Sequence, residues 1–192
     1  MNVQFSFRVV NSAGDRFEFD MLQRIVFGRD VESFPIPLRA PRESAMRILA
    51  YSEERSSPIG GLTVVDTTDD ALSHFAYGIP AASIARTAFY GGMAVLPDYR
   101  RLSVPIRLIF EAQRLFVRPR GIECTWLLYP ADRVPSTRLC RILKYRALPG
   151  IVYELDQPSR VLIRMESREH PRRVNAHSLL DATVREHHAL RN

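Results

Sequence analysis

Cysteine, lysine and long apolar runs are scarce in this chain, and each scarcity excludes a class of protein. The only cysteines among 192 residues are Cys124 and Cys140, which could form one bridge at most, so we expect free thiols rather than a disulfide-rich secreted scaffold. Two thiols also argue against a structural zinc site, and we expect no metal. No apolar run approaches the roughly 20 residues of a spanning helix, and the N-terminus lacks a signal-peptide pattern. We therefore expect a cytoplasmic protein with no membrane span.

The remaining composition is that of one ordinary globular domain, with 46% hydrophobic and 25% charged residues. Basic residues outnumber acidic ones by 27 to 21, and Lys144 is the only basic residue that is not arginine. Guanidinium groups match phosphate and carboxylate, so this surface favours anionic partners, although a coding bias toward arginine would give the same composition. We expect one domain over residues 1–165, followed by a polar tail over 166–192 with an amphipathic helical pattern.

The first third of the chain carries alternating strand and helix signals. Residues 3–10 alternate apolar and polar side chains and predict a strand, and 11–15 predict a turn. Residues 16–27 repeat apolar side chains every three or four positions, which predicts a helix that Gly28 ends. Three prolines in residues 31–41 predict an irregular stretch that could shape the rim of a pocket.

The middle third predicts strands. Residues 47–52 and 59–66 are apolar runs on either side of a polar connection, which is typical of an antiparallel hairpin. Residues 66–80 predict a loop with at most a short turn. Residues 84–96 predict a long strand that Gly91-Gly92 interrupts, either as a bulge or as a simple bend.

The last third predicts helices and strands in alternation. A helix is expected from about residue 106 to 117, with Ser103 as its cap and Pro105 in its first turn, where the missing N–H of proline does no harm. The later elements are a buried strand, a helix that Ser136 caps and a closing pair of strands, over 122–129, 136–146, 151–155 and 161–165.

Three stretches of this sequence, ILAYSEERSSPIGGLTVV, MAVLPDYRRLSVPIRLIFEA and LCRILKYR, together resemble the GNAT superfamily of acyltransferases. ILAYSEERSSPIGGLTVV resembles the second and third strands of that family, and MAVLPDYRRLSVPIRLIFEA resembles its signature of a strand ending in Val-x-Pro-x-x-Arg, a turn and a helix. LCRILKYR stands where the family usually has Leu-Tyr-x-x-Leu-Gly-Phe. The resemblance implies an α/β fold with a mixed, mostly antiparallel central sheet flanked by helices and a splay between two central strands.

The resemblance also implies an activity. It points to an N-acyltransferase that moves an acyl group from a phosphopantetheine thioester, either acyl-CoA or acyl carrier protein, to a small amine acceptor such as an amino acid, with no tightly bound cofactor. In the family, backbone N–H groups of the turn surround the donor phosphate at a helix N-terminus. Here Ser103 and Pro105 replace the usual glycines, and Pro105 removes one donor. The implied donor-binding residues are Met93, Ala94, Val95, Arg100, Arg101, Leu102, Ser103 and Val104.

The segment LQRIVF carries a weaker resemblance, to the long-chain N-acyl amino acid synthases and the acyl-homoserine lactone synthases. Residues 22–27 (LQRIVF) are similar to their Leu-Arg-x-x-Val-Phe pattern, with Gln23 in place of the usual arginine. Their acidic residues and their central Glu and Ser-Arg-Phe are missing, which disfavours lactone synthesis. These enzymes commonly use acyl carrier protein, so we expect this acidic partner at a basic face, although a solvated helix face is the alternative. That face consists of Arg100, Arg101, Arg107, Arg114, Arg118 and Arg120.

Cys140 takes the position of the family tyrosine that protonates the leaving thiolate. A thiol could do this work, because its ordinary pKa lies near that of the leaving group, and Arg138, Arg141 and Lys144 stand close enough in sequence to lower it. The alternative is a small buried hydrophobic side chain. Tyr145, which replaces the family phenylalanine, is expected in the core.

Other acid–base candidates lie near the buried strand. Glu123 and Asp132 flank it and could act as a base, and Tyr90 and Tyr129 could join a water relay. His74 is expected in a loop, and the remaining four histidines in the polar tail.

Two readings without acyl transfer stay open. Net charge +6 fits a basic module that binds nucleic acid, but no aromatic-rich recognition strand or helix-turn-helix accompanies it, so nucleic acid is not the expected partner. The second reading is a non-catalytic domain of the same fold that senses an acyl ligand.

Overall fold

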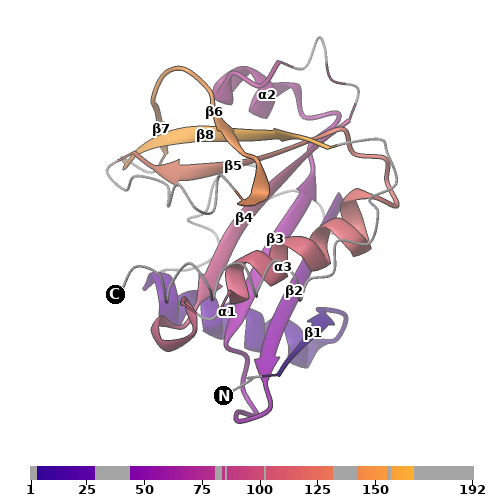
Figure 1. Cartoon of the computed structure of the whole chain (residues 1–192), viewed down its shortest axis with the longest axis vertical. Coiled ribbons are helices and arrows are strands. Elements are labelled where there is room, and N and C mark those ends of the chain that lie inside the picture. Colours follow the sequence, from indigo (N-terminus) through magenta and orange to yellow (C-terminus); the bar gives the residue numbers. More distant parts are fainter. Residues whose placement is uncertain are drawn as a thin grey trace, which may run out of the picture.

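The computed structural model describes residues 4–28, 44–80, 84, 86–101, 103–131, 142–154 and 157–166. Its strands are β1 (Phe5–Val9), β2 (Ala45–Ser52), β3 (Gly60–Asp66), β4 (Thr87–Val95), β5 (Cys124–Pro130), β6 (Arg146–Ala147), β7 (Val152–Glu154) and β8 (Gln157–Met165). They form one sheet of eight strands in the order β1-β2-β3-β4-β5-β8-β6, with β7 also paired to β8. Among these pairs only β4 and β5 run parallel, so the predicted mixed, mostly antiparallel sheet is confirmed (Figure 1).

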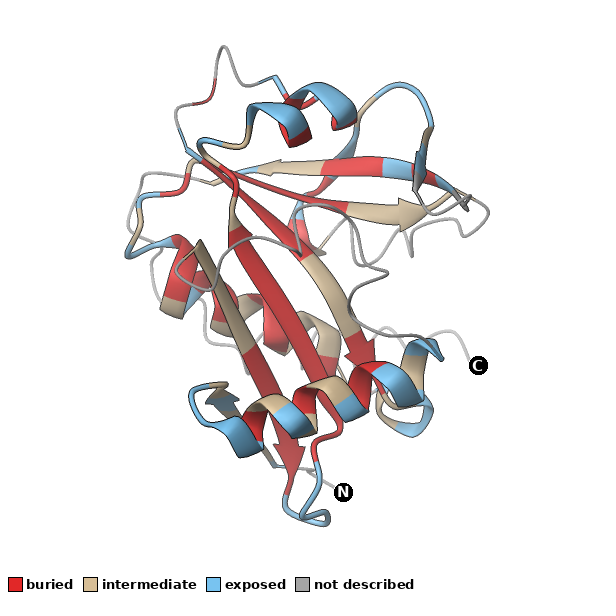
Figure 2. Cartoon of the chain, turned by 180° about the vertical axis from the view of Figure 1, so that it is seen from behind, coloured by how far each residue is buried: buried red, intermediate tan, exposed pale blue. Residues whose placement is uncertain are grey.

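Helices cover both faces of this sheet. They are α1 (Ala13–Phe27), α2 (Ala71–Tyr77) and α3 (Val104–Ala112), with a short 3-10 turn η5 (Pro97–Tyr99) before α3 and a π-helical turn η6 (Gln113–Val117) after it. Helix α3 packs on β2, β3 and β4, whereas α1 packs on β3 and β4 from the other side (Figures 1 and 2). Helix α2 covers the same face of the sheet as α1 but packs near β5, where Tyr77 contacts Trp126. The sheet is therefore the middle of three layers.

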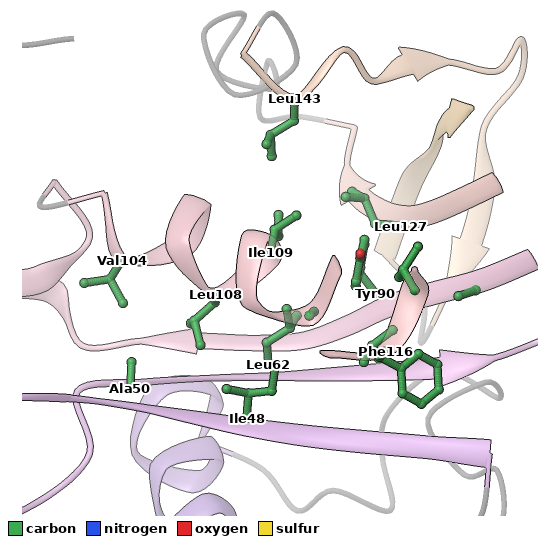
Figure 3. Packing of buried hydrophobic residues seen from close by; sticks show 14 of the residues in the cluster. Ile48, Ala50, Leu62, Tyr90, Val104, Leu108, Ile109, Phe116, Leu127 and Leu143 are labelled. Carbon is green, nitrogen blue, oxygen red and sulfur yellow. The ribbon is translucent and has the colours of Figure 1, made fainter. Parts of the chain in front are cut away.

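The largest part of the core fills the space between the sheet and α3. Figure 3 shows Leu108 of the helix over Ile48 and Leu62 of the strands, and Ile109 nearer to Tyr90. Leu108, Ile109, Ile48 and Leu62 are all fully buried. Their burial fixes α3, and with it the turn before α3, against the centre of the sheet.

Helix α1 begins earlier than its apolar pattern predicts. The Ser12 side chain accepts a hydrogen bond from the Asp15 N–H at 3.0 Å, and the Asp15 carboxylate accepts one from the Ser12 N–H at 3.0 Å. This reciprocal capping box starts the helix at Ala13, so the predicted turn over residues 11–15 is wrong in its second half. Gly28 ends the helix in the left-handed conformation, as predicted.

A second correction concerns residues 66–80, which contain helix α2 instead of only a loop. The Asp70 carboxylate accepts a hydrogen bond from the Ser73 N–H at 2.9 Å, and Gly78 ends the helix with φ of 63°. His74 therefore lies on a helix and not in a loop. It is buried, with Nε2 2.8 Å from the hydroxyl of Thr87.

The predicted hairpin is confirmed as β2 and β3, and the predicted closing strands as β7 and β8. Arg146, expected at the end of a helix, lies in the short strand β6 instead. Three predicted segments fall wholly or mainly outside the described residues: the irregular stretch 31–41, the first six residues of the helix 136–146, and the tail from 167 onward. None of the helices within the described ranges is long and apolar enough to cross a membrane.

Candidate functional site

Strands β4 and β5 pair only over their first halves. The register runs from Thr87 opposite Cys124 to Tyr90 opposite Leu127 and then stops. Beyond it, Gly91, Ala94 and Val95 of β4 remain paired to β3, and residues 128–130 of β5 remain paired to β8, so each strand follows its other neighbour. Both views show the two ribbons diverging (Figures 1 and 2). The predicted splay between two central strands is confirmed.

The parted half of β4 contains a β-bulge. Thr63 of β3 lies opposite Gly91 and Gly61 lies opposite Ala94, so one residue of β3 faces two residues of β4, Gly92 and Met93. Gly92 has a φ of 56°, which glycine adopts without the steric cost of a side chain. The glycine pair thus marks a bulge, which Gly92 and Met93 form, and the alternative of a simple bend is wrong.

Backbone groups of β4 point toward the side that β5 has left. The Leu96 N–H donates to the Ile59 carbonyl at 2.9 Å, so it points toward β3. Because backbone groups alternate along a strand, the N–H and carbonyl of Val95 point the opposite way. The Val95 carbonyl accepts a hydrogen bond from Nε of Arg100 at 3.0 Å, which places Arg100 on this open side.

The N-terminus of α3 follows directly. Val104 and Ile106 begin the helix with N–H groups that have no partner within it, and Pro105 between them has no N–H to offer. Ser103 occupies the predicted cap position, but its side chain makes no capping hydrogen bond, which corrects that expectation. Its φ is 61°, a conformation that favours glycine and that costs energy for serine.

The predicted basic face is divided in the structure. Arg107 is half-buried over the Phe5 ring, 5.1 Å from its centroid, and burial lowers its pKa. Arg114 forms an ion pair with Glu111 at 2.7 Å, and Arg120 lies over another aromatic ring. The exposed arginines of the set are Arg100, Arg101, Arg114 and Arg118.

The three predicted catalytic residues lie in different places. Cys140 lies outside the described residues, as do Asp132 and the donor-site residue Leu102. Glu123 comes just before β5, at the paired end, where its N–H donates to the Arg86 carbonyl at 2.9 Å. Tyr129 lies past the last β4–β5 pair and is half-buried. The structure therefore brings Tyr129, but not Glu123, to the parted half.

The backbone of the predicted donor site comes together, whereas some of its side chains belong to the core. Ala94, Val95 and Val104 are buried, and Val104 packs against Gly60. Met93 is partly buried on the same cluster. Only the arginines of the predicted donor set present charged side chains at the surface.

A buried polar network lies at the paired end, and its pattern is not visible in the sequence. The Thr125 hydroxyl donates to the Glu166 carboxylate at 2.8 Å and lies 3.0 Å from the Tyr145 hydroxyl. Arg164 forms an ion pair with Glu166 at 3.2 Å. Tyr145 is buried, as predicted for a core residue, and burial raises its pKa.

Tyr90, the last paired residue of β4, is also buried. Figure 3 shows its side chain near Ile109 and Leu127, on the face that α3 covers. Its hydroxyl has no hydrogen-bond partner within the described residues, and burial raises its pKa well above the usual value.

Gln23 is a site residue that sequence reasoning noted only as a departure from a family pattern. It is fully buried on α1, and its Nε2 donates to the Gly92 carbonyl at 2.6 Å. Its position four residues after Phe19 and three before Val26 is the signal that could have placed it on the apolar face of α1. Within the described part of the chain, no three potential metal ligands come together.

Comparisons with known proteins show likeness in fold and little likeness in sequence. No protein-family model matches the chain, and no curated protein sequence matches it. The solved structure of FeeM, an N-acyl amino acid synthase from uncultured soil microbes, is similar with a TM-score of 0.64 at 11% identity, over 85% of this chain and 92% of that one. The structure of NAA60 of Arabidopsis thaliana in complex with acetyl-CoA is similar with a TM-score of 0.61 at 15% identity, over 84% of this chain and 98% of that one.

A bacterial acetyltransferase extends the same comparison. The ribosomal-protein-S18-alanine N-acetyltransferase of Escherichia coli gives a TM-score of 0.56 at 11% identity, over 88% of this chain and 98% of that one. These proteins cover nearly the whole chain and agree in the layered sheet that the motifs predicted. The chain therefore has the GNAT fold, the fold of these N-acyltransferases.

Proposed function

We propose that this protein is a GNAT-type N-acyltransferase that moves an acyl group from a phosphopantetheine thioester to a small amine. The observation that carries the proposal is the parting of β4 and β5 beside the N-terminus of α3. An extended thioester arm needs a gap between strands, backbone donors along it and a cationic end for its phosphate. The gap beside β4, the backbone N–H groups of β4 and the arginines before α3 support these three needs, and residues 93–104 include the donors and the arginines.

In this proposal the donor lies along the parted half of β4. The outward N–H of Val95, with that of Met93, donates to the thioester carbonyl. Arg100, Arg101 and the first N–H groups of α3, together with the backbone of residues 102–104, bind the phosphate. A helix N-terminus and guanidinium groups both favour an anion at this place.

The chemistry follows from these positions. The neutral amine attacks the thioester carbon, and the carbonyl becomes an oxyanion that the β4 N–H groups stabilise. Collapse of this intermediate breaks the carbon–sulfur bond, forms the amide and releases the thiol, while the amine nitrogen loses one proton and the thiolate gains one. Tyr129 and Cys140 are the proposed groups for that proton transfer. Glu123 is left out of the proposal, because it lies at the paired end of β5.

The donor and the acceptor are proposed in broad terms. The acetyl-CoA complex of NAA60 supports a coenzyme A donor, and FeeM, as an N-acyl amino acid synthase, supports an amino acid acceptor. The exposed Arg100, Arg101 and Arg118 would attract an acidic carrier protein equally well. Acyl-CoA and acyl carrier protein share the phosphopantetheine arm, so assays with each donor separate the two.

Thiol release from acyl-CoA and acyl carrier protein, measured with a panel of amino acids and other amines, tests the activity. Replacement of Arg100 by Gln should raise the KM for the donor about tenfold, because it removes a charged phosphate ligand. Arg118→Gln, an exposed arginine beyond η6, is the matched control and should change the KM for acyl-CoA less than twofold. No turnover and no thioester binding with any donor would exclude the proposed enzyme.

A second candidate is a domain of this fold that binds an acyl thioester without turnover. Pro105, which removes a phosphate-binding N–H, and the left-handed Ser103 favour it. Saturable donor binding without thiol release, under conditions where all amines are tested, would distinguish this candidate from the enzyme.

A further inference from the structure

Gln23 connects helix α1 to the bulge of β4. Its side chain is fully buried, and Nε2 donates to the Gly92 carbonyl at 2.6 Å. The bulge packs closely around it, since a Cβ at Gly92 would lie 3.5 Å from Oε1 of Gln23 and 3.7 Å from Oγ1 of Thr63. Gln23 therefore contacts β4 at the one place where an extra residue interrupts its regular ladder.

This hydrogen bond fixes the orientation of one peptide group. The Gly92 carbonyl and the Met93 N–H belong to the same trans peptide, in which the two groups point in opposite directions. Because Gln23 holds the carbonyl toward α1, the Met93 N–H points away from α1. It therefore points toward the opposite face of the sheet, which α3 covers, beside the edge of β4 that β5 has left.

We propose that Gln23 is a positioning residue for acyl transfer, which holds the bulge so that the Met93 N–H is aimed at the thioester carbonyl. This inference rests on the proposed function. Gln23 does not touch the reacting atoms; it acts through the 92–93 peptide.

The side-chain oxygen of Gln23 indicates that this residue does more than fill space in the core. Oε1 has no hydrogen-bond partner among the described residues although it is buried, and a polar atom in that state destabilises a core. Methionine would fill a similar volume without that penalty. The feature that methionine could not supply is the N–H donor to Gly92.

Gln23→Met is therefore the direct test. With saturating donor and amine, kcat should fall about tenfold or more, because a small displacement of an oxyanion donor is costly, whereas the KM for the donor should stay within twofold. The matched control is Gln113→Met, a buried glutamine at the paired end, whose replacement should leave kcat within twofold. An unchanged kcat in folded Gln23→Met, or an equal fall in both variants, would overturn the proposal.

A second variant covers the case in which Gln23→Met does not fold. Gln23→Leu likewise removes the N–H donor and places no polar atom in the core. We expect the same fall in kcat with the same small change in KM. Wild-type kcat in this variant would overturn the proposal.

The amide resonance of Met93 separates failure of this inference from failure of the proposed function. Loss of the Gln23 donor should shift this resonance in the free protein, whereas the amide resonance of Val65 on β3 should not change. If the wild type shows no turnover, the enzyme proposal fails while these resonances still decide the role of Gln23. An unaltered Met93 amide in Gln23→Met would overturn that role whatever the activity.

Discussion

The two halves of the β4–β5 pair differ in burial and in how their polar groups are used. In the paired half, all four residues of each strand, 87–90 and 124–127, are buried. In the parted half, residues 91–93 of β4 and 128–130 of β5 are only half-buried. The paired half is thus fully packed, whereas the parted half of β4 is half-buried at residues 91–93 and buried again only at Ala94 and Val95. The residues that stabilise the fold and those proposed to bind the donor therefore lie in adjacent segments of the same two strands.

Polar groups in the paired half bind mainly to one another. The Thr87 hydroxyl lies 2.8 Å from both the Thr67 hydroxyl and Nε2 of His74, and the indole N–H of Trp126 donates to Thr67 at 3.1 Å. A network with this many internal partners rigidifies the sheet where the strands meet. It gives the divergence beyond Tyr90 a fixed starting point.

The largest expected effect comes from the core of the paired half. Trp126→Ala removes a fully buried ring that lies 4.4 Å from Phe89 and 5.1 Å from Tyr77, measured between ring centroids. The free energy of unfolding, measured in urea, should fall by about 3–5 kcal/mol. Tyr129→Ala, in the parted half of the same strand, should lower the free energy of unfolding by less than half of that amount. Equal losses would remove the energetic distinction between the two halves.

Alkaline pH should weaken the paired half through Cys124. Burial, followed by the nearby Glu166 charge, raises the pKa of its thiol to about 11 from an ordinary value near 9. The unfolded chain therefore loses this proton first, so the stabilisation is complete below pH 9 and is lost as the pH rises toward 11. The loss should reach about 2–3 kcal/mol, and Cys124→Val should show a correspondingly flatter decline. Parallel declines in both proteins would contradict this role of the thiol.

Thr125→Val probes the polar network at the paired end. It removes the hydroxyl that joins Tyr145 to Glu166, leaving buried polar groups without a shared partner. We expect a loss of about 1–3 kcal/mol in urea unfolding and a kcat within twofold of wild type. Thr125→Ser keeps the hydroxyl and should recover most of the stability. A large fall in kcat for Thr125→Val alone would extend the functional region into the paired half.

The smallest expected effect lies next to the parted half. Ser103→Gly should raise the free energy of unfolding by up to about 1 kcal/mol, because glycine adopts φ of 61° without steric cost. Lys144→Gly is the matched control, since Lys144 has a similar φ of 58° and lies away from the α3 N-terminus. Thermal unfolding of both variants checks the expectation. A gain confined to Lys144→Gly would show that the Ser103 side chain compensates its own backbone strain.

Much of the fold could be predicted because its signals are local. Two apolar runs on either side of a polar connection identified the hairpin of β2 and β3, and the pair Gly91-Gly92 identified the bulge. Helix α2 was missed for a physical reason. Its Leu72 and Phe75 are 63% and 88% exposed, so they form no core-facing stripe, and only Asp70 and Gly78 mark its ends.

The site could be predicted only in outline. Motif spacing indicated the segment from Met93 to Val104, but nothing local indicates which end of β5 stays paired, and that pairing separates Tyr129 from Glu123. The left-handed backbone of Ser103 was hidden because serine is not the residue that such a φ favours. The contact of Gln23 with Gly92 joins residues 69 positions apart, a relation that only the tertiary structure determines.

The bulge in β4 makes the local shape of this strand depend on residue count as well as on residue identity. Gly91 stays opposite Thr63 and Ala94 stays opposite Gly61 on either side of it, so excising Gly92 would leave both flanking alignments intact and produce an unbroken strand. No exchange of one amino acid for another can do the same, because the surplus unit would still have to be accommodated. An interrupted and a continuous β4 thus differ by one residue, and only a change in chain length converts one into the other.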